Sequence, residues 1–430
     1  MSEYVWKESQ IRTRGEMSLD LLKQTLNAVF EQQTPADIFL RKMFQKDRRI
    51  GGRDRRLYSE LIFAVFRWYG PLQKNFGGSD RFPAYALAGA GIAENIQDPV
   101  ILYFLQKCGI EKVLETVEIT DPLSRLNHFL LAIGKEAVSA EELLPAWCYD
   151  HFSFTGSPEF YHTLQRRPPL WLRIQSGDHE KIICELKEQY PGAYEHDSLK
   201  RAVAIPGARV NLPEWDLYKN GNVEVQDLSS QCIGAVCAPQ KGELWWDACA
   251  GGGGKSLQLM MLSGGKCRII ASDIRIDRLE ELKKRAKRAG YHSISLLGWD
   301  GSVVPQKLCA ACDGVLVDAP CSSSGRWRRN PESRWTLTSD KLALFPELQL
   351  KLLKNASQAV KAGGQLVYAT CSMFKDEDEM VVRKFLESMP DFELEGFAHP
   401  LNGSLTDGYC CILPSEGDCD GSFVARFRRK

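Results

Sequence analysis

The stretch WWDACAGGGGKSLQL, residues 245 to 259, places four glycines between an apolar run and a segment with helical periodicity. A glycine-rich loop between a strand and a helix lets backbone N–H groups approach a ligand closely. Its GKS sequence matches the end of a phosphate-binding P-loop, and GVLVD at residues 314 to 318 could supply the Asp that holds Mg²⁺. A P-loop also requires glycine at the position of Cys249, because a positive φ is costly for other residues. The spacing therefore argues against a P-loop.

From residue 241 onward, apolar runs alternate with helical segments. The runs LWWDA, RIIASD, SISLLGW, CDGVLVDAP and GQLVYATCS each end in polar or small residues. Such alternation predicts an α/β domain with a parallel, doubly wound sheet whose ligand lies at the carboxyl ends of the strands. YCCILP and SFVARFRR predict a closing antiparallel hairpin. We expect one domain over residues 241–430.

The remaining chain predicts two further domains, since 430 residues are too many for one ordinary core. Residues 1–150 show helical periodicity, as in SLDLLKQTLNAVF, where Ser18 is expected to cap the helix. Residues 151–240 change to short strands and an amphipathic helix, which predicts a small α+β module.

The composition limits the possible classes of protein. The formal net charge is +0, so affinity for nucleic acid has to come from local patches. No apolar stretch is long enough to span a bilayer, and the first residues lack the apolar core of a signal peptide. The scattered cysteines favour a reducing compartment, and Cys309-Ala-Ala-Cys312 has no partner pair for a zinc site. We expect a cytoplasmic monomer with no metal.

Three acidic residues follow the glycine loop at the ends of predicted strands: Asp273, Asp300 and Asp318. An acid about twenty residues beyond such a loop binds the ribose hydroxyls of a nucleoside in doubly wound folds. Each Asp alone could merely cap a helix. Together they favour an adenosine-bearing ligand without a phosphate chain. A hydride-carrying dinucleotide is a weaker alternative, because the glycines are contiguous.

Two cysteines also follow predicted strands: Cys321 in DAPCSSSG and Cys371 in ATCSMF. Either alone could be an inert buried side chain. Together at one sheet edge they favour nucleophilic chemistry, which suits methylation at carbon 5 of a pyrimidine. A thiolate that adds to carbon 6 makes carbon 5 nucleophilic towards a methyl sulfonium, and Asp318 could stabilise the adduct at the N3 side of the ring.

These motifs resemble those of a known family. CAGGGGK, ASD, the acid of GWD, VDAPCSSSG and YATCS resemble the ordered motifs of S-adenosylmethionine-dependent RNA (cytosine-5)-methyltransferases, above all the bacterial Sun (or Fmu) ribosomal RNA methyltransferases. The resemblance covers residues 223 to 427. It implies a Rossmann-like class I methyltransferase domain with a mixed seven-stranded sheet. RRPPLWLR and VQDLSSQ resemble the family's linker module, and the helical region resembles its NusB-like RNA-binding domain.

The resemblance also implies roles for individual residues. The family's nucleophile corresponds to Cys371, and Cys321 corresponds to the cysteine that helps release the product. The implied cofactor site is Cys249, Ala250, Gly251, Gly252, Gly253, Gly254, Lys255, Asp273, Asp300 and Asp318. The family usually has proline at the position of Gly252, which puts the rigidity of this loop in question. Asp420-Gly421-Ser422-Phe423 differs from the usual Asp-Gly-Phe-Phe, which is expected to affect local packing only.

Two basic segments are candidates for RNA contact. GRWRRNPESRW, residues 325 to 335, interleaves arginines with tryptophans that could stack on bases, although the tryptophans could instead be buried. The second segment contains Arg41, Lys42, Lys46, Arg48, Arg49, Arg53, Arg55 and Arg56. The favoured function is methylation of 16S ribosomal RNA. The alternatives are transfer RNA as substrate, a non-catalytic assembly factor, and exchanged roles for the two cysteines.

Overall fold

The computed structural model describes residues 6–110, 119–207 and 210–430. The chain divides into two compact units. The first unit comprises Met1–Asp150, Thr155–Arg166 and Trp327–Thr338, and the second comprises His151–Phe154, Arg167–Arg326 and Ser339–Lys430. The division into three domains at residues 150 and 240 stays a prediction.

The first unit is helical, as the sequence predicts. Its helices are α1 (Glu8–Phe30), α2 (Ala36–Lys46), α3 (Gly52–Arg67), α4 (Tyr69–Phe76), α5 (Phe82–Ala93), α6 (Val100–Cys108), α7 (Pro122–Ala132), α8 (Pro158–Leu164) and α14 (Ser333–Thr336). Helix α5 is buried along most of its length because it consists largely of alanine and glycine. A Cβ on Gly89 would meet Leu72 at 2.8 Å and Phe129 at 3.0 Å, so this glycine permits close packing of the helices.

The first helix begins earlier than Ser18, the residue expected to cap it. Helix α1 starts at Glu8, and Ser18 lies buried in its interior. The Ser18 Oγ donates to the carbonyl of Arg14 at 2.8 Å, so its hydroxyl is satisfied within the helix. The prediction of a cap at Ser18 is wrong because a hydroxyl one turn after a carbonyl can bond inside a helix as well as at its start.

The segment Trp327–Thr338 belongs to the first unit although it comes from the second half of the chain. Trp327, Arg328 and Arg334 are all at most 1% exposed. Arg334 donates to the carbonyls of Leu143 and Leu164 at 3.0 and 3.3 Å. The expectation that these three side chains contact RNA is therefore wrong, and the alternative of buried tryptophan holds for Trp327.

A small antiparallel sheet opens the second unit. Its strands are β1 (Leu170–Ile174), β2 (Tyr194–Glu195), β3 (Ala202–Ile205) and β4 (Val223–Val225), in the order β2-β3-β1-β4. Helices α9 (His179–Gln189) and α10 (Asp216–Lys219) accompany it. Apolar residues of α9 and of β1, β3 and β4 form one buried cluster. This is the small α+β module that the sequence predicts.

The large sheet holds the predicted methyltransferase fold. Its strands are β5 (Leu244–Asp247), β6 (Arg268–Asp273), β7 (Ile294–Gly298), β8 (Cys312–Asp318), β9 (Val360–Thr370), β10 (Phe392–Leu394), β11 (Tyr409–Ile412) and β12 (Ser422–Arg429). Seven strands follow the order β10-β12-β9-β8-β5-β6-β7, and β11 pairs with β12 off this path. Strands β5 to β9 pair in parallel with one another, whereas β12 pairs antiparallel with β9, β10 and β11. The predicted mixed sheet and closing hairpin are confirmed.

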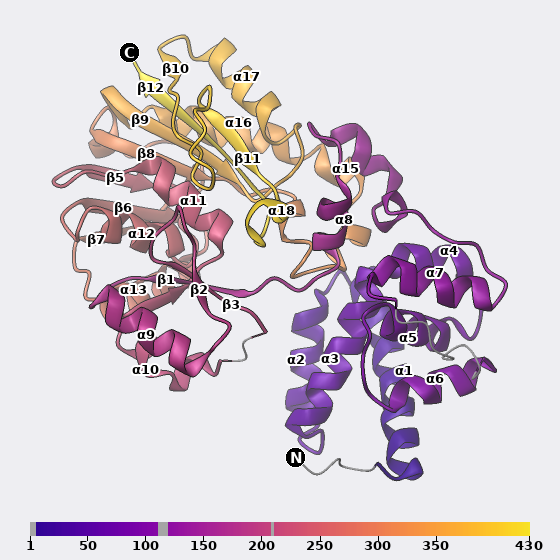
Figure 1. Cartoon of the computed structure of the whole chain (residues 1–430). Helices are drawn as coiled ribbons and strands as arrows, with labels where there is room; N and C mark the ends of the chain where they lie inside the picture. The colour runs from indigo at the N-terminus through magenta and orange to yellow at the C-terminus, as the bar shows by residue number, and fades with distance from the viewer. Residues whose placement is uncertain (1–5, 111–118, 208–209) are drawn as a thin grey trace. The chain divides into compact units, whose positions relative to one another are not determined.

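Helices cover both faces of this sheet (Figure 1). Residues of α16 (Phe345–Ser357) and α17 (Glu379–Ser388) form one buried cluster with the sheet. Residues of α11 (Leu228–Cys237), α12 (Gly254–Leu262) and α13 (Ile276–Arg288) form another. Two further short helices of this unit are α15 (Ser339–Leu342) and α18 (Pro414–Gly417). Because β5, β6, β7, β8 and β9 run in the same direction, the turns that follow them all lie along one side of the sheet, at the carboxyl ends of the strands.

Candidate active site

The glycine loop connects β5 to α12 and is tied to the end of β6. Gly251 and Gly253 have φ values of 52° and 82°, in the left-handed region that favours glycine. A Cβ on Gly253 would come within 2.3 Å of the Leu282 side chain, so no other residue fits there. The Gly251 N–H donates to Asp273 Oδ2 at 2.9 Å. Asp273, the acid predicted to bind the ribose, therefore orders the loop through this hydrogen bond.

Asp300 lies at an open cleft beside the end of β6. The cleft has a volume of about 410 Å³ and is lined by Ile274, Gly298, Trp299, Asp300 and Val303. Asp300 is exposed, and its carboxylate accepts from the N–H and hydroxyl of Ser302 at 3.0 and 2.5 Å. These hydrogen bonds lower the pKa of Asp300. An open cleft that places an ionised carboxylate beside Ile274, Trp299 and Val303 suits the sugar and base of a nucleoside.

A buried carboxylate that the sequence analysis did not select lies beneath the loop. Asp247 ends β5 and is 0% exposed. Its Oδ2 accepts from the Ser256 hydroxyl at 2.5 Å, whereas its Oδ1 has no hydrogen-bond partner among the described residues. Burial raises the pKa of Asp247 to about 7. In the sequence, Asp247 is marked only by its position at the end of a predicted strand before the glycines. Many residues that merely cap a helix occupy a similar position.

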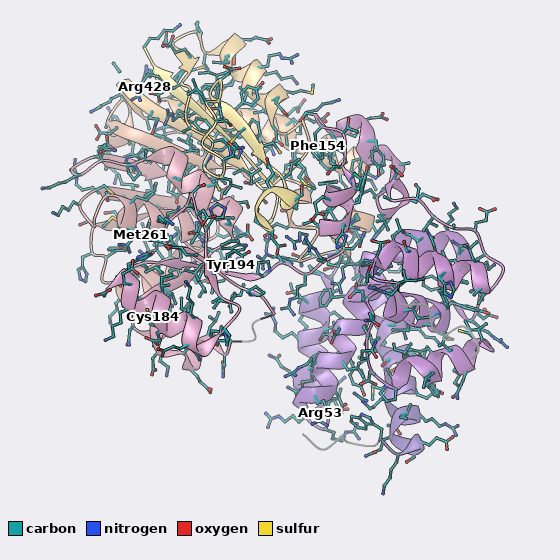
Figure 2. All side chains as sticks on the ribbon, in the orientation of Figure 1. Arg53, Phe154, Cys184, Tyr194, Met261 and Arg428 are labelled. Carbon is teal, nitrogen blue, oxygen red and sulfur yellow. The ribbon has the colours of Figure 1, made fainter. Side chains whose placement is uncertain are left out.

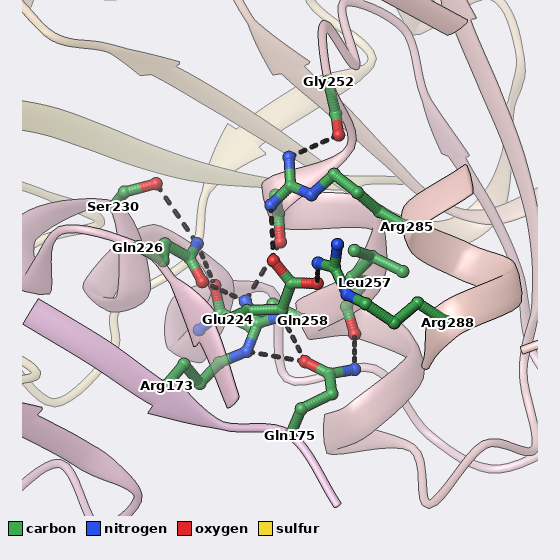
Figure 3. A network of polar contacts seen from close by, with 11 residues as sticks. Arg173, Gln175, Glu224, Gln226, Ser230, Gly252, Leu257, Gln258, Arg285 and Arg288 are labelled. Atoms are coloured by element: carbon green, nitrogen blue, oxygen red, sulfur yellow. Dashed lines mark hydrogen bonds and ion pairs between the residues drawn. The ribbon is translucent and has the colours of Figure 1, made fainter. Parts of the chain in front are cut away.

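A buried polar network joins the small sheet to the glycine loop (Figure 3). Arg173 on β1 donates to the carbonyl of Gly254 at 3.0 Å. Arg285 on α13 donates to the carbonyl of Gly252 at 2.5 Å and to Glu224 Oε2 at 3.0 Å. Glu224, on β4, is 1% exposed and also pairs with Arg288. The position where the family usually has proline is thus restrained here by a side-chain contact.

Glutamines extend this network into α12. Gln175 Oε1 accepts a hydrogen bond from the Arg173 guanidinium, and Gln175 Nε2 donates to the carbonyl of Leu257 at 3.0 Å. Gln226 accepts from Arg173 and donates to Gln258 Oε1 at 2.8 Å. Buried polar groups are tolerated only where they are hydrogen-bonded, and here their partners are loop and helix atoms. The small sheet therefore supports the predicted cofactor loop directly.

Lys255 and Asp318 connect the glycine loop with the end of β8. The Lys255 Nζ lies 2.7 Å from Asp318 Oδ2, and the two side chains are 14% and 30% exposed. Burial by itself would lower the pKa of Lys255, but the Asp318 carboxylate outweighs it and the pKa is raised. The predicted cofactor residue Lys255 and the predicted catalytic residue Asp318 thus form one ion pair.

The two predicted catalytic cysteines are in contact. Cys321 follows β8, Cys371 follows β9, and their Sγ atoms are 3.2 Å apart. The hydrogen bond from Cys321 lowers the pKa of Cys371 despite its burial, and the Ser323 hydroxyl at 3.4 Å acts in the same direction. The same hydrogen bond and burial raise the pKa of Cys321. With its pKa lowered while that of Cys321 is raised, Cys371 is the thiol of the pair that ionises more readily.

The segment Asp420-Gly421-Ser422-Phe423 is joined by backbone hydrogen bonds to the turns that hold Cys321 and Cys371, called here the cysteine turns. The N–H of Gly421 donates to the carbonyl of Gly325 at 2.7 Å, and the N–H of Gly325 donates to the carbonyl of Cys371 at 2.9 Å. A Cβ on Gly325 would lie 2.0 Å from the Gly421 carbonyl oxygen. Ser422, where the family usually has phenylalanine, begins β12 and is buried.

Ala250 and Cys249 are the predicted cofactor residues that precede the glycines of the loop. Ala250 is tied to β6 through its N–H, which donates to Ser272 O at 2.8 Å. Burial raises the pKa of Cys249, so this thiol is not primed for nucleophilic attack.

Within the described ranges there is no group of three or more His, Cys, Asp or Glu side chains that could hold a metal. The same residues contain no helix that is long and apolar enough to cross a membrane.

Comparisons with known proteins agree with this geometry. Residues 235–428 match the family described as 16S rRNA methyltransferase RsmB/F. Ribosomal RNA small subunit methyltransferase B of Proteus mirabilis is 30% identical over 296 residues, which cover 67% of this chain and 66% of that protein. The protein of the same name from Cronobacter sakazakii is 27% identical over 420 residues, covering 89% of this chain and 92% of that protein.

Solved structures show the same fold. The crystal structure of PH0851 aligns with a TM-score of 0.73 at 24% identity, covering 97% of this chain and 98% of that one. The structure of NSun6 from Pyrococcus horikoshii with SFG aligns with a TM-score of 0.54 at 18% identity, covering 63% of this chain and 93% of that one.

Proposed function

The chain belongs to the RsmB/F family of S-adenosylmethionine-dependent ribosomal RNA (cytosine-5)-methyltransferases, and from this premise we propose that it methylates a cytosine of 16S rRNA through a covalent adduct with Cys371. The family membership accounts for the reaction and the cofactor. The choice of 16S rRNA follows the names of the relatives, and the covalent route follows the cysteine geometry.

The residues of the glycine loop and the acids beside it fit S-adenosylmethionine. The left-handed glycines bring backbone N–H groups to the sheet edge, and the cleft at Asp300 has room and walls for adenosine. When bound, S-adenosylmethionine supplies an electrophilic methyl group on its sulfonium. We assign its binding to Cys249, Ala250, Gly251, Gly252, Gly253, Gly254, Lys255, Asp273, Asp300 and Asp318.

The single observation that carries the covalent route is the thiol pair. In the proposed reaction the Cys371 thiolate adds to carbon 6 of cytosine, and the electron pair of the 5,6 double bond makes carbon 5 nucleophilic. After carbon 5 has been methylated, loss of its proton restores the double bond and expels the thiolate. Cys321 is assigned to this release, because its thiol lies 3.2 Å from the Cys371 sulfur. Once Cys371 is bonded to carbon, no neighbouring thiolate raises the pKa of Cys321, so Cys321 can lose its own proton to solvent and then accept the proton that leaves carbon 5.

Asp318 is proposed to hold the N3 edge of the ring during addition. Charge accumulates at this edge when the thiolate adds, and a hydrogen bond placed there stabilises the adduct. Its partner Lys255 keeps an ammonium 2.7 Å from the carboxylate, so a proton is available to the pair. Both side chains are partly buried, which strengthens these interactions relative to water.

The surface of α2 and α3 is the proposed site of RNA contact. Arg41, Lys42, Lys46, Arg48, Arg49, Arg53 and Arg56 are exposed, and Arg55 is half-buried. Figure 2 labels Arg53, the second residue of α3. Clustered guanidiniums and ammoniums attract phosphates although the whole chain is neutral. The proposal places the protein in the cytoplasm as a monomer acting on RNA.

Bisulfite sequencing of total RNA tests the substrate. RNA is compared from cells that contain the protein and from cells that lack its gene. We expect one cytosine of 16S rRNA to become sensitive to bisulfite when the gene is deleted, and to be protected again when the gene is restored. Loss of protection at a transfer RNA position, with 16S rRNA unchanged, would instead establish the transfer RNA alternative.

A further inference from the structure

A buried carboxylate connects the two cysteine turns. Glu377 lies between β9 and α17 and is 0% exposed. Its Oε2 accepts from the hydroxyls of Ser322 and Ser372 at 2.5 and 2.6 Å. Its Oε1 accepts from the N–H of Ser322 at 2.8 Å. Ser322 directly follows Cys321 and Ser372 directly follows Cys371, so one carboxylate is bonded to both turns.

The direct contacts between hydroxyl groups of the two turns are longer than the hydrogen bonds to Glu377. The Ser322 and Ser372 hydroxyl oxygens are 3.4 Å apart, and those of Ser324 and Ser372 are 3.3 Å apart. The N–H of Met373 donates to Ser324 Oγ at 2.8 Å, and Cys371 Sγ lies 3.2 Å from Cys321 Sγ and 3.4 Å from Ser323 Oγ. Hydrogen bonds to a charged acceptor are stronger than those between neutral groups. The carboxylate is therefore the main side-chain tie between the two turns.

Glu377 is itself fixed by its surroundings. Gln349 on α16 donates to its Oε1 at 2.9 Å, and the Tyr368 hydroxyl on β9 donates to its carbonyl at 2.5 Å. All the hydrogen bonds that its carboxylate receives within the described residues come from neutral donors. Burial raises the pKa of Glu377. A carboxylate without a cation is costly to bury, so its benefit lies in the geometry it imposes.

We propose that Glu377 is a positioning residue whose carboxylate holds the two cysteine turns at the separation that brings the Cys321 thiol into hydrogen-bond contact with Cys371. The inference rests on the proposed function for its catalytic meaning, because the thiolate of Cys371 is the proposed nucleophile. The contact between the thiols is the largest cause of the lowered pKa of Cys371. Loosening the turns weakens this contact and makes Cys371 a poorer thiolate at neutral pH.

Alkylation of Cys371 by iodoacetamide measures this contact without RNA or methyl transfer. Mass spectrometry of the peptide that contains Cys371 gives the alkylation rate as a function of pH in the full chain. The variants are Glu377→Gln, Cys321→Ala and the double variant, with Glu387→Gln on α17 as the control because Glu387 is exposed. Gln preserves the size of the side chain but replaces one acceptor oxygen by a donor, so either the two serine hydroxyls at Oε2 or the N–H donors of Ser322 and Gln349 at Oε1 lose their acceptor.

We expect Glu377→Gln to raise the pH of half-maximal alkylation by about one unit, towards that of Cys321→Ala. The double variant should show no further shift, since both changes remove the same contact. The control should titrate as the wild type does. Ser372→Ala, which cuts one side of the tie and leaves the carboxylate in place, should shift the midpoint in the same direction by less.

An unchanged midpoint in both Glu377→Gln and Ser372→Ala would overturn the inference and leave Glu377 with a structural role only. Additive shifts in the double variant would also overturn it, because they would mean that Glu377 acts on Cys371 by another route. Failure of the proposed function has a different signature. Cys371→Ala would then retain methyl transfer, whatever the alkylation midpoints are.

Discussion

The cofactor edge and the cysteine edge of the large sheet differ in the charged groups that hold them. At the cofactor edge, the loop of residues 248–254, guanidiniums donate to two backbone carbonyls of the loop, and the Asp273 carboxylate accepts from one N–H. At the cysteine edge, the turns Cys321–Ser324 and Cys371–Phe374, a buried carboxylate accepts from hydroxyls and an N–H. Both are turns at the carboxyl ends of parallel strands, so the sheet alone does not account for the difference.

The difference predicts unequal responses to pH. A guanidinium stays protonated through the physiological range, so the hold on the glycine loop does not change there. Burial raises the pKa of Glu377, and its proton occupancy therefore changes closer to neutrality than that of an ordinary glutamate. The guanidinium contacts of the cofactor loop are therefore independent of pH in this range, whereas the contacts of Glu377 at the cysteine edge depend on its protonation.

The largest expected effect is at the cysteine edge. Cys371→Ala should lower methyl transfer by about 10³-fold or more and form no covalent complex with RNA, because the proposed route has no other nucleophile. Cys321→Ala should still add to RNA but release it slowly, and should accumulate a denaturant-resistant complex. Denaturing gels with labelled RNA measure both, with the double variant as control. A trapped complex in Cys371→Ala and none in Cys321→Ala would reverse the two roles.

The next effect is at the cofactor edge. Glu224→Ala leaves the partly buried Arg285 and Arg288 without their buried counter-ion and should lower the free energy of unfolding by about 3 kcal/mol. Arg285 then holds Gly252 less firmly, so affinity for S-adenosylmethionine should also fall. Urea unfolding and calorimetry measure the two quantities. Glu280→Ala on the exposed face of α13 is the control. Unchanged affinity in Glu224→Ala would show that the network supports the fold and not the loop.

The third prediction concerns Asp247, which lies beneath the cofactor loop but resembles Glu377 in its raised pKa. Burial raises its pKa from 3.8 to about 7. The folded state therefore binds a proton that the unfolded state has lost, and stability falls as pH rises from about 4 to 7. In the Asp247→Asn variant, the fall in the free energy of unfolding between pH 5 and pH 8 should be smaller than in the wild type by about 3 kcal/mol. Urea unfolding at pH 5 and pH 8 measures it.

Asp391→Asn, at an exposed position, is the control for this measurement. It should leave the difference in unfolding free energy between pH 5 and pH 8 as it is in the wild type. An equal decline in Asp247→Asn and the wild type would mean that the buried carboxyl keeps an ordinary pKa. Water or another donor would then have to reach Asp247 Oδ1.

The smallest effect per residue is expected outside both edges. Replacing Arg48, Arg49 and Arg56 with Gln should weaken RNA binding and reduce the slope of log affinity against log salt by about 0.7 for each RNA phosphate that the protein no longer neutralises. Filter binding at several salt concentrations measures the slope. Affinity for S-adenosylmethionine and alkylation of Cys371 should stay at wild-type values. An unchanged slope would identify these arginines as an ordinary solvated surface.

The site residues that were predicted are those that short stretches of sequence identify. Strand ends, a glycine loop and cysteines in small-residue turns are recognisable because each depends on a few consecutive residues. Parallel strands then place these turns at one edge, which is why the proximity of Cys321 and Cys371 could be anticipated. The helix start and the burial of Trp327 could not be, since a serine or tryptophan suits several environments.

The sequence by itself determined the alternation of strands and helices, the identity of the turn residues and, through its ordered motifs, the family of the chain. Only the tertiary structure decided which side chains support those turns. Arg173 reaches Gly254 across 81 residues, and Glu377 reaches Ser322 across 55. The physical reason is that a strand or helix depends on neighbours along the chain, whereas a buried charge depends on partners that only the folded path brings within hydrogen-bond distance.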